Sequence, residues 1–170
     1  IWPGCQVYVS SNGVDYTSAA TIADRGVFGT TTTALPAFAG GVVVDEVSRV
    51  TVNVGLGELA STTRDALLND ENINALLLGD EIVRFVTAAL VSTNPNVYTL
   101  SRFLRGQRGT EWAVSGHVIG ERAVLLQPQG LRRIVQQQSE IGALRYIKAV
   151  TNGQTLSSAT AVEFTNTGNS

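Results

Sequence analysis

Hydrophobic and polar residues alternate along much of this chain with the two-residue period that is typical of β-strands. Residues 5–10 alternate in this way, and residues 11–13 carry a Ser-Asn-Gly turn signal. Residues 16–22 are then the predicted returning strand. The pattern therefore predicts an antiparallel hairpin at 5–23.

The longest apolar stretch, residues 75–91, is rich in Val and Leu and predicts two strands. Residues 92–96 contain an Asn-Pro-Asn sequence that is typical of a hairpin loop. Residues 97–104 are predicted to return as a strand, in which Tyr98 and Leu100 point to the same face.

Residues 61–68 carry the one helix signal, because Ser and Thr residues that cap helices precede an apolar Ala-Leu-Leu sequence. Residues 24–41, with their glycines and threonine run, are predicted to be a loop. Roughly nine or ten short strands, with a turn about every ten residues, are typical of β-sandwiches and small barrels. The predicted fold is mainly β with one short helix. At least one further strand is predicted within 42–44 and 47–54, and others are predicted at 122–127, 131–136, 146–151 and 162–165.

Hydrophobic residues make up 44% of the 170 residues and charged residues only 15%, which allows a packed core beneath a surface of low charge. The net charge of -2 gives no electrostatic reason to expect nucleic-acid binding. No apolar stretch approaches the roughly 18 residues that a membrane-spanning helix needs, so no membrane span is expected.

Cysteine and histidine, the residues that form disulfides and zinc sites, are scarce in this sequence. Cys5 is the only cysteine and His117 the only histidine, so an internal disulfide is excluded and a structural zinc site is not expected. No loop gathers the several carboxylates that calcium requires. The sequence predicts neither a metal nor a cofactor.

Position 1 is Ile, and the chain contains no methionine. We expect the sequence to be a piece of a longer polypeptide. Function is then expected to be divided between this piece and the rest of that polypeptide.

Catalytic groups are sparse. A nucleophile–histidine arrangement would have to use His117, but the sequence has no Gly-x-Ser-x-Gly elbow, and Ser115 lies in a predicted loop. The acidic pairs Asp45–Glu46 and Asp80–Glu81 are strand neighbours that point to opposite faces, so neither forms a carboxylate dyad by itself. We expect no catalytic residue, and an enzyme that acts through His117 is the least favoured hypothesis.

Residues 101–111 form the most specific segment of the sequence. Gly106 and Gly109 predict a tight turn that holds three arginines and a glutamate. One interpretation, which we favour, is an internal ion pair between an arginine and Asp80, Glu81 or Glu111 that locks the turn against the preceding hairpin. The other is that Arg105 and Arg108 bind a carboxylate or phosphate on a partner or sugar polymer.

Three segments carry a resemblance to a known family: Leu78-Gly-Asp-Glu81, Tyr98-x-Leu-Ser101 and Leu104-Arg-Gly-Gln-Arg-Gly-Thr-Glu-Trp112. The chain resembles the C-terminal region of the large tail-tip proteins of long-tailed phages and gene transfer agents. These are also called baseplate hub or host-specificity proteins. The resemblance runs from about residue 7 to residue 164, and the segment 104–112 is its most specific part.

The resemblance implies a virion structural protein at the distal tail tip or baseplate, made in the bacterial cytoplasm. It implies a homotrimer in the full-length protein, other tail and baseplate proteins as partners, and a cell-surface glycan or receptor as a further partner. It supplies no catalytic residue and no cofactor. The motif residues expected to be structural are Asp80, Glu81, Arg105, Gly106, Arg108, Gly109, Thr110, Glu111 and His117. The candidates for contact with a glycan or partner are Trp112, Arg102 and Tyr98.

The two ends of the chain also resemble the ends of a fibronectin-type-III sandwich. We therefore expect residues 1–55 and 143–166 to form one discontinuous β-sandwich. Residues 60–140 are expected to be an inserted β-subdomain that carries the motif, and residues 167–170 a frayed tail.

Two functional hypotheses follow. The first is a structural module of a phage-like tail tip that takes part in tail assembly, host attachment and DNA delivery. The alternative is a carbohydrate-binding β-sandwich of an adhesin or glycan-processing enzyme. That alternative requires an exposed aromatic platform, for which Trp112 with Tyr98 or Tyr16 is the candidate.

Overall fold

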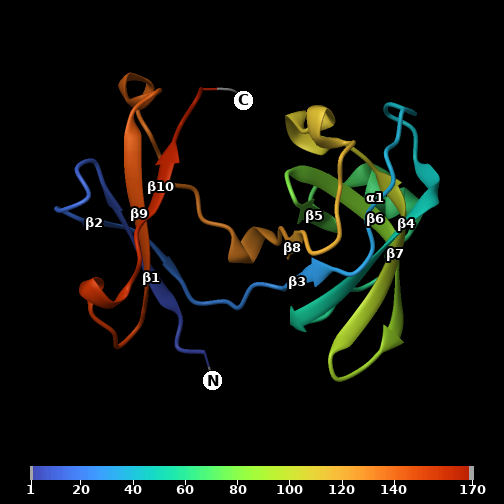
Figure 1. The fold of residues 1–170 in the computed structure, drawn as a ribbon, viewed down its shortest axis with the longest axis horizontal. Helices are drawn as coiled ribbons and strands as arrows, with labels where there is room; N and C mark the ends of the chain where they lie inside the picture. The colour runs from blue at the N-terminus through green and yellow to red at the C-terminus, as the bar shows by residue number, and fades with distance from the viewer. Residues whose placement is uncertain (1, 169–170) are drawn as a thin grey trace. The chain divides into compact units, whose positions relative to one another are not determined.

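The chain divides into two compact units in the computed structural model shown in Figure 1. Residues 2–168 are described, apart from the side chain of Gln129. The sheet unit comprises residues 1–25 and 129–170, and the barrel unit comprises residues 26–128. The barrel unit is continuous in sequence and is therefore inserted into the sheet unit.

The sheet unit is built on one antiparallel sheet with the strand order β10-β9-β1-β2. The central strand β1 pairs with β2 on one side, as the predicted hairpin requires, and with β9 on the other. Val7 of β1 and Val150 of β9 are buried. The strands are β1 (Cys5–Ser10), β2 (Thr17–Ile22), β9 (Leu144–Thr151) and β10 (Val162–Thr165).

The barrel unit is a closed six-stranded antiparallel barrel with the strand order β3-β4-β7-β6-β5-β8. Pairing of β3 with β8, with Phe28 opposite Val124, closes the ring. The strands are β3 (Phe28–Thr31), β4 (Asp45–Leu56), β5 (Ala75–Leu78), β6 (Glu81–Ser92), β7 (Asn96–Leu104) and β8 (Arg122–Leu125).

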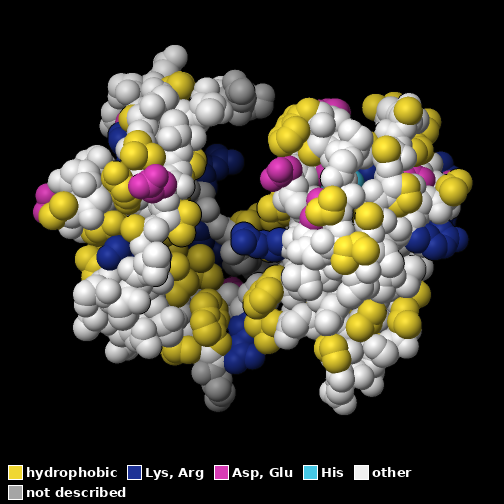
Figure 2. Space-filling view, viewed as in Figure 1, with side chains coloured by type: hydrophobic (Ala, Val, Ile, Leu, Met, Phe, Trp, Pro, Cys, Tyr) yellow, Lys and Arg dark blue, Asp and Glu magenta, His cyan; other side chains and the backbone are white. Residues whose placement is uncertain are grey.

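The barrel is filled by the inward-facing side chains of its strands. In β4, Val50, Val52 and Val54 alternate with more exposed residues and point into the core, as period-2 alternation requires. Phe85 and Phe103 are completely buried at the centre. On the face shown in Figure 2, the hydrophobic side chains that remain exposed are scattered over the barrel unit in small groups.

Residues 2–168 contain one α-helix, α1 (Arg64–Asn69), which packs on the outside of the barrel. Thr63 caps its first turn by accepting a hydrogen bond from the backbone N–H of Ala66. Its Leu67 is fully buried against Val86 of β6 and Leu104 of β7. The remaining helical turns are the 3-10 helices η1 (Gln107–Gly109), η2 (Glu111–Ala113), η3 (Pro128–Gly130), η4 (Gln138–Glu140) and η5 (Leu156–Ser158).

The predicted fold class is confirmed: the protein is mainly β, sandwich-like in class, with one short α-helix. Within that class, the strands form one four-stranded sheet and one closed barrel. No helix among residues 2–168 has both the length and the hydropathy that crossing a bilayer would require. The predicted frayed tail, 167–170, lies partly outside the described residues, since 169 and 170 are not among them.

The division between the units falls after residues 25 and 128, whereas the sequence predicted boundaries near 55–60 and 140–143. Both β3 and β4, expected to belong to the sandwich or to a loop, are barrel strands, because β4 pairs along its length with β7. The predicted strand at 131–136 is not formed. Its predicted hairpin partner, β8, pairs with β3 on one edge and with β5 on the other, so β8 has no free edge for residues 131–136.

Closure of the barrel depends on a glycine. A Cβ atom at Gly29 of β3 would overlap the carbonyl oxygen of Asn53 on β4, so the two strands approach too closely for any side chain. We expect Gly29→Ala to lower the free energy of unfolding by about 1–3 kcal/mol, because the backbone must shift to admit a methyl group. Chemical denaturation followed by circular dichroism measures the change.

Gly26→Ala is the matched control, since a Cβ there meets no atom within 4 Å. Equal destabilisation by both substitutions would contradict a steric requirement at Gly29.

Candidate functional site

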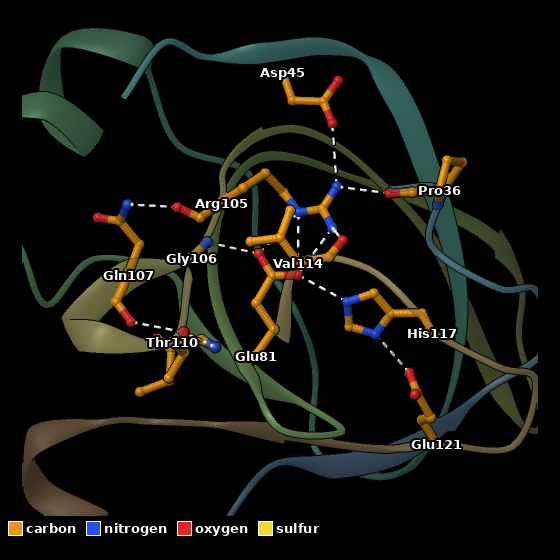
Figure 3. A network of polar contacts seen from close by, with 11 residues as sticks. Pro36, Asp45, Glu81, Arg105, Gly106, Gln107, Thr110, Val114, His117 and Glu121 are labelled. Carbon is orange, nitrogen blue, oxygen red and sulfur yellow. Dashed lines mark hydrogen bonds and ion pairs between the residues drawn. The ribbon is translucent and has the colours of Figure 1, made fainter. Parts of the chain in front are cut away.

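A buried ionic network joins three barrel strands at one end of the barrel unit (Figure 3). Glu81 opens β6, Arg105 follows the last residue of β7, and Asp45 opens β4. These strands are neighbours in the barrel, so their ends bring the three side chains together. The exposed fraction is 0% for Glu81, 4% for Arg105 and 1% for Asp45.

Arg105 lies at the centre of this network. Its guanidinium makes a bidentate contact with Glu81, through Nε to Oε1 at 2.9 Å and Nη2 to Oε2 at 2.9 Å. It also donates to Asp45 Oδ2 at 3.3 Å and to the carbonyl oxygens of Pro36 and Val114 at 2.9 and 3.0 Å. A fork of this geometry fits the planar guanidinium of arginine and would not fit lysine.

Glu81 accepts two further hydrogen bonds. The backbone N–H of Gly106 donates to its Oε1 at 2.6 Å, and Nε2 of His117 lies 2.8 Å from its Oε2. The other ring nitrogen of His117, Nδ1, lies 2.8 Å from Oε2 of Glu121. Because both ring nitrogens face carboxylate oxygens, the arrangement favours the doubly protonated imidazolium. The His117 side chain is only 2% exposed.

The pKa values follow from these contacts. The hydrogen bond with Glu81 raises the pKa of His117 above its ordinary value of 6.5; burial opposes this rise, and Glu121 adds to it. Burial alone would raise the pKa of Glu81, but hydrogen bonds from His117, Arg105 and Gly106 outweigh it and hold that pKa below 4.5. The pKa of Asp45 is likewise lowered, since hydrogen bonds from Ser48 outweigh its burial.

The turn after β7 is shaped by residues in the left-handed region. Gly106 has φ 57 and ψ 40, and a Cβ there would lie 2.9 Å from Cα of Glu111. Thr110 ties the turn to β6, because its hydroxyl accepts from the N–H of Ile82 at 2.9 Å and donates to the Gln107 carbonyl at 2.8 Å. Gly109 also has a positive φ, of 83 degrees.

The structure gathers some of the predicted motif residues and separates others. Arg105 forms the internal ion pair that we favoured, with Glu81 as its partner rather than Asp80 or Glu111. Arg108 lies at the surface and donates to the Glu71 carbonyl and the Asn72 side chain. In the described part of the chain, neither Asp80 nor Glu111 takes part in an ion pair.

The three predicted contact residues have different environments. Trp112 is 72% exposed, and Arg102 pairs at 2.9 Å with Glu46 at the surface. Tyr98 is a correction to the prediction, because it lies in the barrel core with only 5% of its surface exposed. The face that Tyr98 shares with Leu100 is the inner face of β7, so Tyr98 cannot contact a glycan or partner.

Two members of the network were absent from the predicted site. The sequence predicts Asp45 only as a strand neighbour of Glu46, and Glu121 is not among the predicted site residues. The signal for Asp45 was local: its side chain accepts hydrogen bonds from the N–H groups of Val47 and Ser48, as an aspartate that begins a turn does. No local signal identifies Glu121, because the tertiary fold brings its partner His117 into the network.

The network is chemically complete within the described residues. No buried side-chain nitrogen or oxygen there lacks a hydrogen-bond partner. The same residues contain no group of three His, Cys, Asp or Glu side chains arranged to hold a metal ion. The arrangement can therefore hold β4, β6, β7 and the 105–121 segment in a fixed geometry.

The residues of this network lie in a part of the chain that matches a known protein family. A family model described as "Rcc01698-like, C-terminal" matches residues 26–124. The chain belongs to the Rcc01698-like C-terminal family. The residues that match this family span β3 to β8, and thus nearly the whole barrel unit with its buried network. No curated protein matches the chain.

Removal of the central charge should be costly. We expect Arg105→Met to lower the free energy of unfolding by about 3–5 kcal/mol, because Glu81 and Asp45 would remain buried without the guanidinium that they share. Denaturant unfolding measures the loss. The control, Arg64→Met, breaks an ion pair whose side chains are 53% and 47% exposed, and we expect about 0–1 kcal/mol. Similar losses in the two variants would contradict the central role of Arg105.

Stability should also depend on pH through His117. Its pKa is higher in the folded than in the unfolded state, so its stabilising effect is fully present below about pH 6.5 and is lost as pH rises through the folded-state pKa. We expect the urea midpoint to fall across that interval, and His117→Gln to remove the slope. A slope that persists unchanged in His117→Gln would assign it to another group.

Proposed function

We propose that this chain is a structural module of a phage-like tail tip or baseplate hub protein, with a part in tail assembly, host attachment and DNA delivery. The resemblance of its motif to tail-tip proteins supports this role. The motif lies within residues 26–124, which the Rcc01698-like C-terminal family model matches. The partners would be other tail and baseplate proteins, with the full-length protein a homotrimer at the distal end of the tail.

One observation carries the proposal: the buried charged residues of the motif, Arg105 and Glu81, make all their contacts inside the barrel unit. Arg105 and Glu81 bond to each other, and their remaining donor and acceptor positions bond to Asp45, His117 and Gly106. A motif that serves catalysis leaves a nucleophile or base open to substrate. A motif that is saturated and buried supports a rigid, non-catalytic part of an assembly.

The alternative glycan platform at Trp112 has little support. Its predicted partner Tyr98 is in the barrel core, and the second predicted partner, Tyr16, lies in the sheet unit with Lys148 Nζ 4.9 Å from its ring centroid. The predicted platform of Trp112 with Tyr98 is therefore not formed.

Microscopy of assembled particles tests the proposal. We expect gold-labelled antibodies against this chain to mark the distal tail end of particles purified from the bacterium that encodes it. In the encoding gene, Arg105→Met should reduce the number of complete tails several-fold because the barrel unit loses stability, whereas Arg64→Met should leave assembly near normal.

Absence of the label from all tailed particles, with the chain found elsewhere in the cell, would reject a tail-tip role. Normal tails in a strain that lacks the barrel unit would reject a role in assembly.

A further inference from the structure

The outer face of the barrel carries a groove that the buried network does not use. It crosses β3 and its two neighbours, β4 and β8, has a volume of about 700 Å³, and lies wholly within the barrel unit. Strand alternation sets its position: in β3, Gly29 and Thr31 are buried, whereas the side chains of Phe28 and Thr30 are exposed on the outer face.

Strand register places the outward side chains in two adjacent rows. Thr30 pairs with Arg122 on one side and with Asn53 on the other, which gives a polar row across the three strands. Two residues along β3, Phe28 pairs with Val124 on β8 and with Leu56 on β4, where the register shifts and Gly55 lines the groove. The second row is therefore apolar, with a gap where Gly55 has no side chain.

The aromatic ring in the second row is accessible. Phe28 is 50% exposed, although it is a large apolar residue within a strand. Because Gly55 presents no side chain beside it, a flat ligand can lie along the floor of the groove. An exposed aromatic residue in a concave site, next to polar groups, is a common arrangement for binding small molecules and sugars.

The polar row differs sharply from the buried network. Among the described residues, the side chains of Arg122, Thr30 and Asn53 form no hydrogen bond or ion pair, whereas every buried polar side-chain atom has a partner. Arg122 is also the only charged residue among those that line the groove. The groove thus offers one unpaired guanidinium, one amide and one hydroxyl beside an exposed aromatic ring.

We propose that this groove binds a carboxylate-bearing sugar, of the uronic acid class, within a cell-surface polysaccharide. The guanidinium of Arg122 pairs with the sugar carboxylate, for which its planar fork is suited. The apolar face of the sugar ring packs on Phe28, and its hydroxyl groups bond to Thr30 and Asn53. A single cation suits a monoanionic sugar, whereas nucleic acid requires an extended basic surface.

This site deepens the host-attachment part of the proposed function and rests on it. The two are nevertheless separable. Binding is measured on the isolated chain, whereas location at the tail tip is measured on particles, so either can fail while the other holds.

Titration of the 15N-labelled chain with trigalacturonic acid, followed by amide chemical shifts, tests the proposal. We expect shift changes confined to β3, β8 and the neighbouring part of β4, with an affinity that falls as salt increases. Arg122→Gln and Phe28→Ala should each weaken binding about tenfold or more. Arg64→Gln, at an exposed arginine on α1 outside the groove, should leave the affinity unchanged.

Three results would overturn the proposal. One is the absence of shift changes at millimolar trigalacturonic acid in a folded chain. Another is equal binding of neutral maltotriose, and the third is full binding by Arg122→Gln. Because Phe28 contributes to the barrel surface, the urea midpoint of each variant is measured as a check on folding. If Phe28→Ala fails to fold, the affinity of Arg122→Gln alone tests the proposal.

Discussion

The ion pair between Arg105 and Glu81 is the interaction on which the barrel unit depends. A charge that is removed from water destabilises a fold unless a partner of opposite charge and further hydrogen bonds surround it. Here a single guanidinium reaches two carboxylates and two backbone carbonyls, and Glu81 in turn holds the Gly106 amide and His117. Groups on three strands and two loops must therefore be in place together, which favours one arrangement over compact alternatives.

The sequence predicts contacts between residues that are close in the chain better than contacts between residues that are far apart in it. The hairpins and the turn at Gly106 were predicted because their signals lie within a few residues of one another. The pairing of Arg105 with Glu81 was foreseen as one of three options, since both residues flank the same hairpin. Asp45 and Glu121 were missed as partners, because the strand order that brings them to the site is decided by contacts between residues far apart in sequence.

Strand β3 is a second element that the sequence did not predict. Its glycine and threonines resemble a loop by composition, yet Gly29 is what permits β3 to lie close against β4. The outward threonine and phenylalanine then become part of a surface rather than a core. Tyr98 shows the converse, since alternation correctly placed it beside Leu100 but could not reveal which face of the strand was the interior. Period-2 patterns divide side chains into two sets, and only the three-dimensional fold decides which set is buried.

The pairing of β3 with β8 brings the two ends of the inserted barrel unit together. These strands are the first and the last of the unit, so the points where the chain enters and leaves it are hydrogen-bonded neighbours. The sheet unit therefore needs only two neighbouring attachment points for the barrel unit, as it would for a short surface loop. A module of this kind can be gained, lost or exchanged between proteins by recombination without stretching the sheet that receives it.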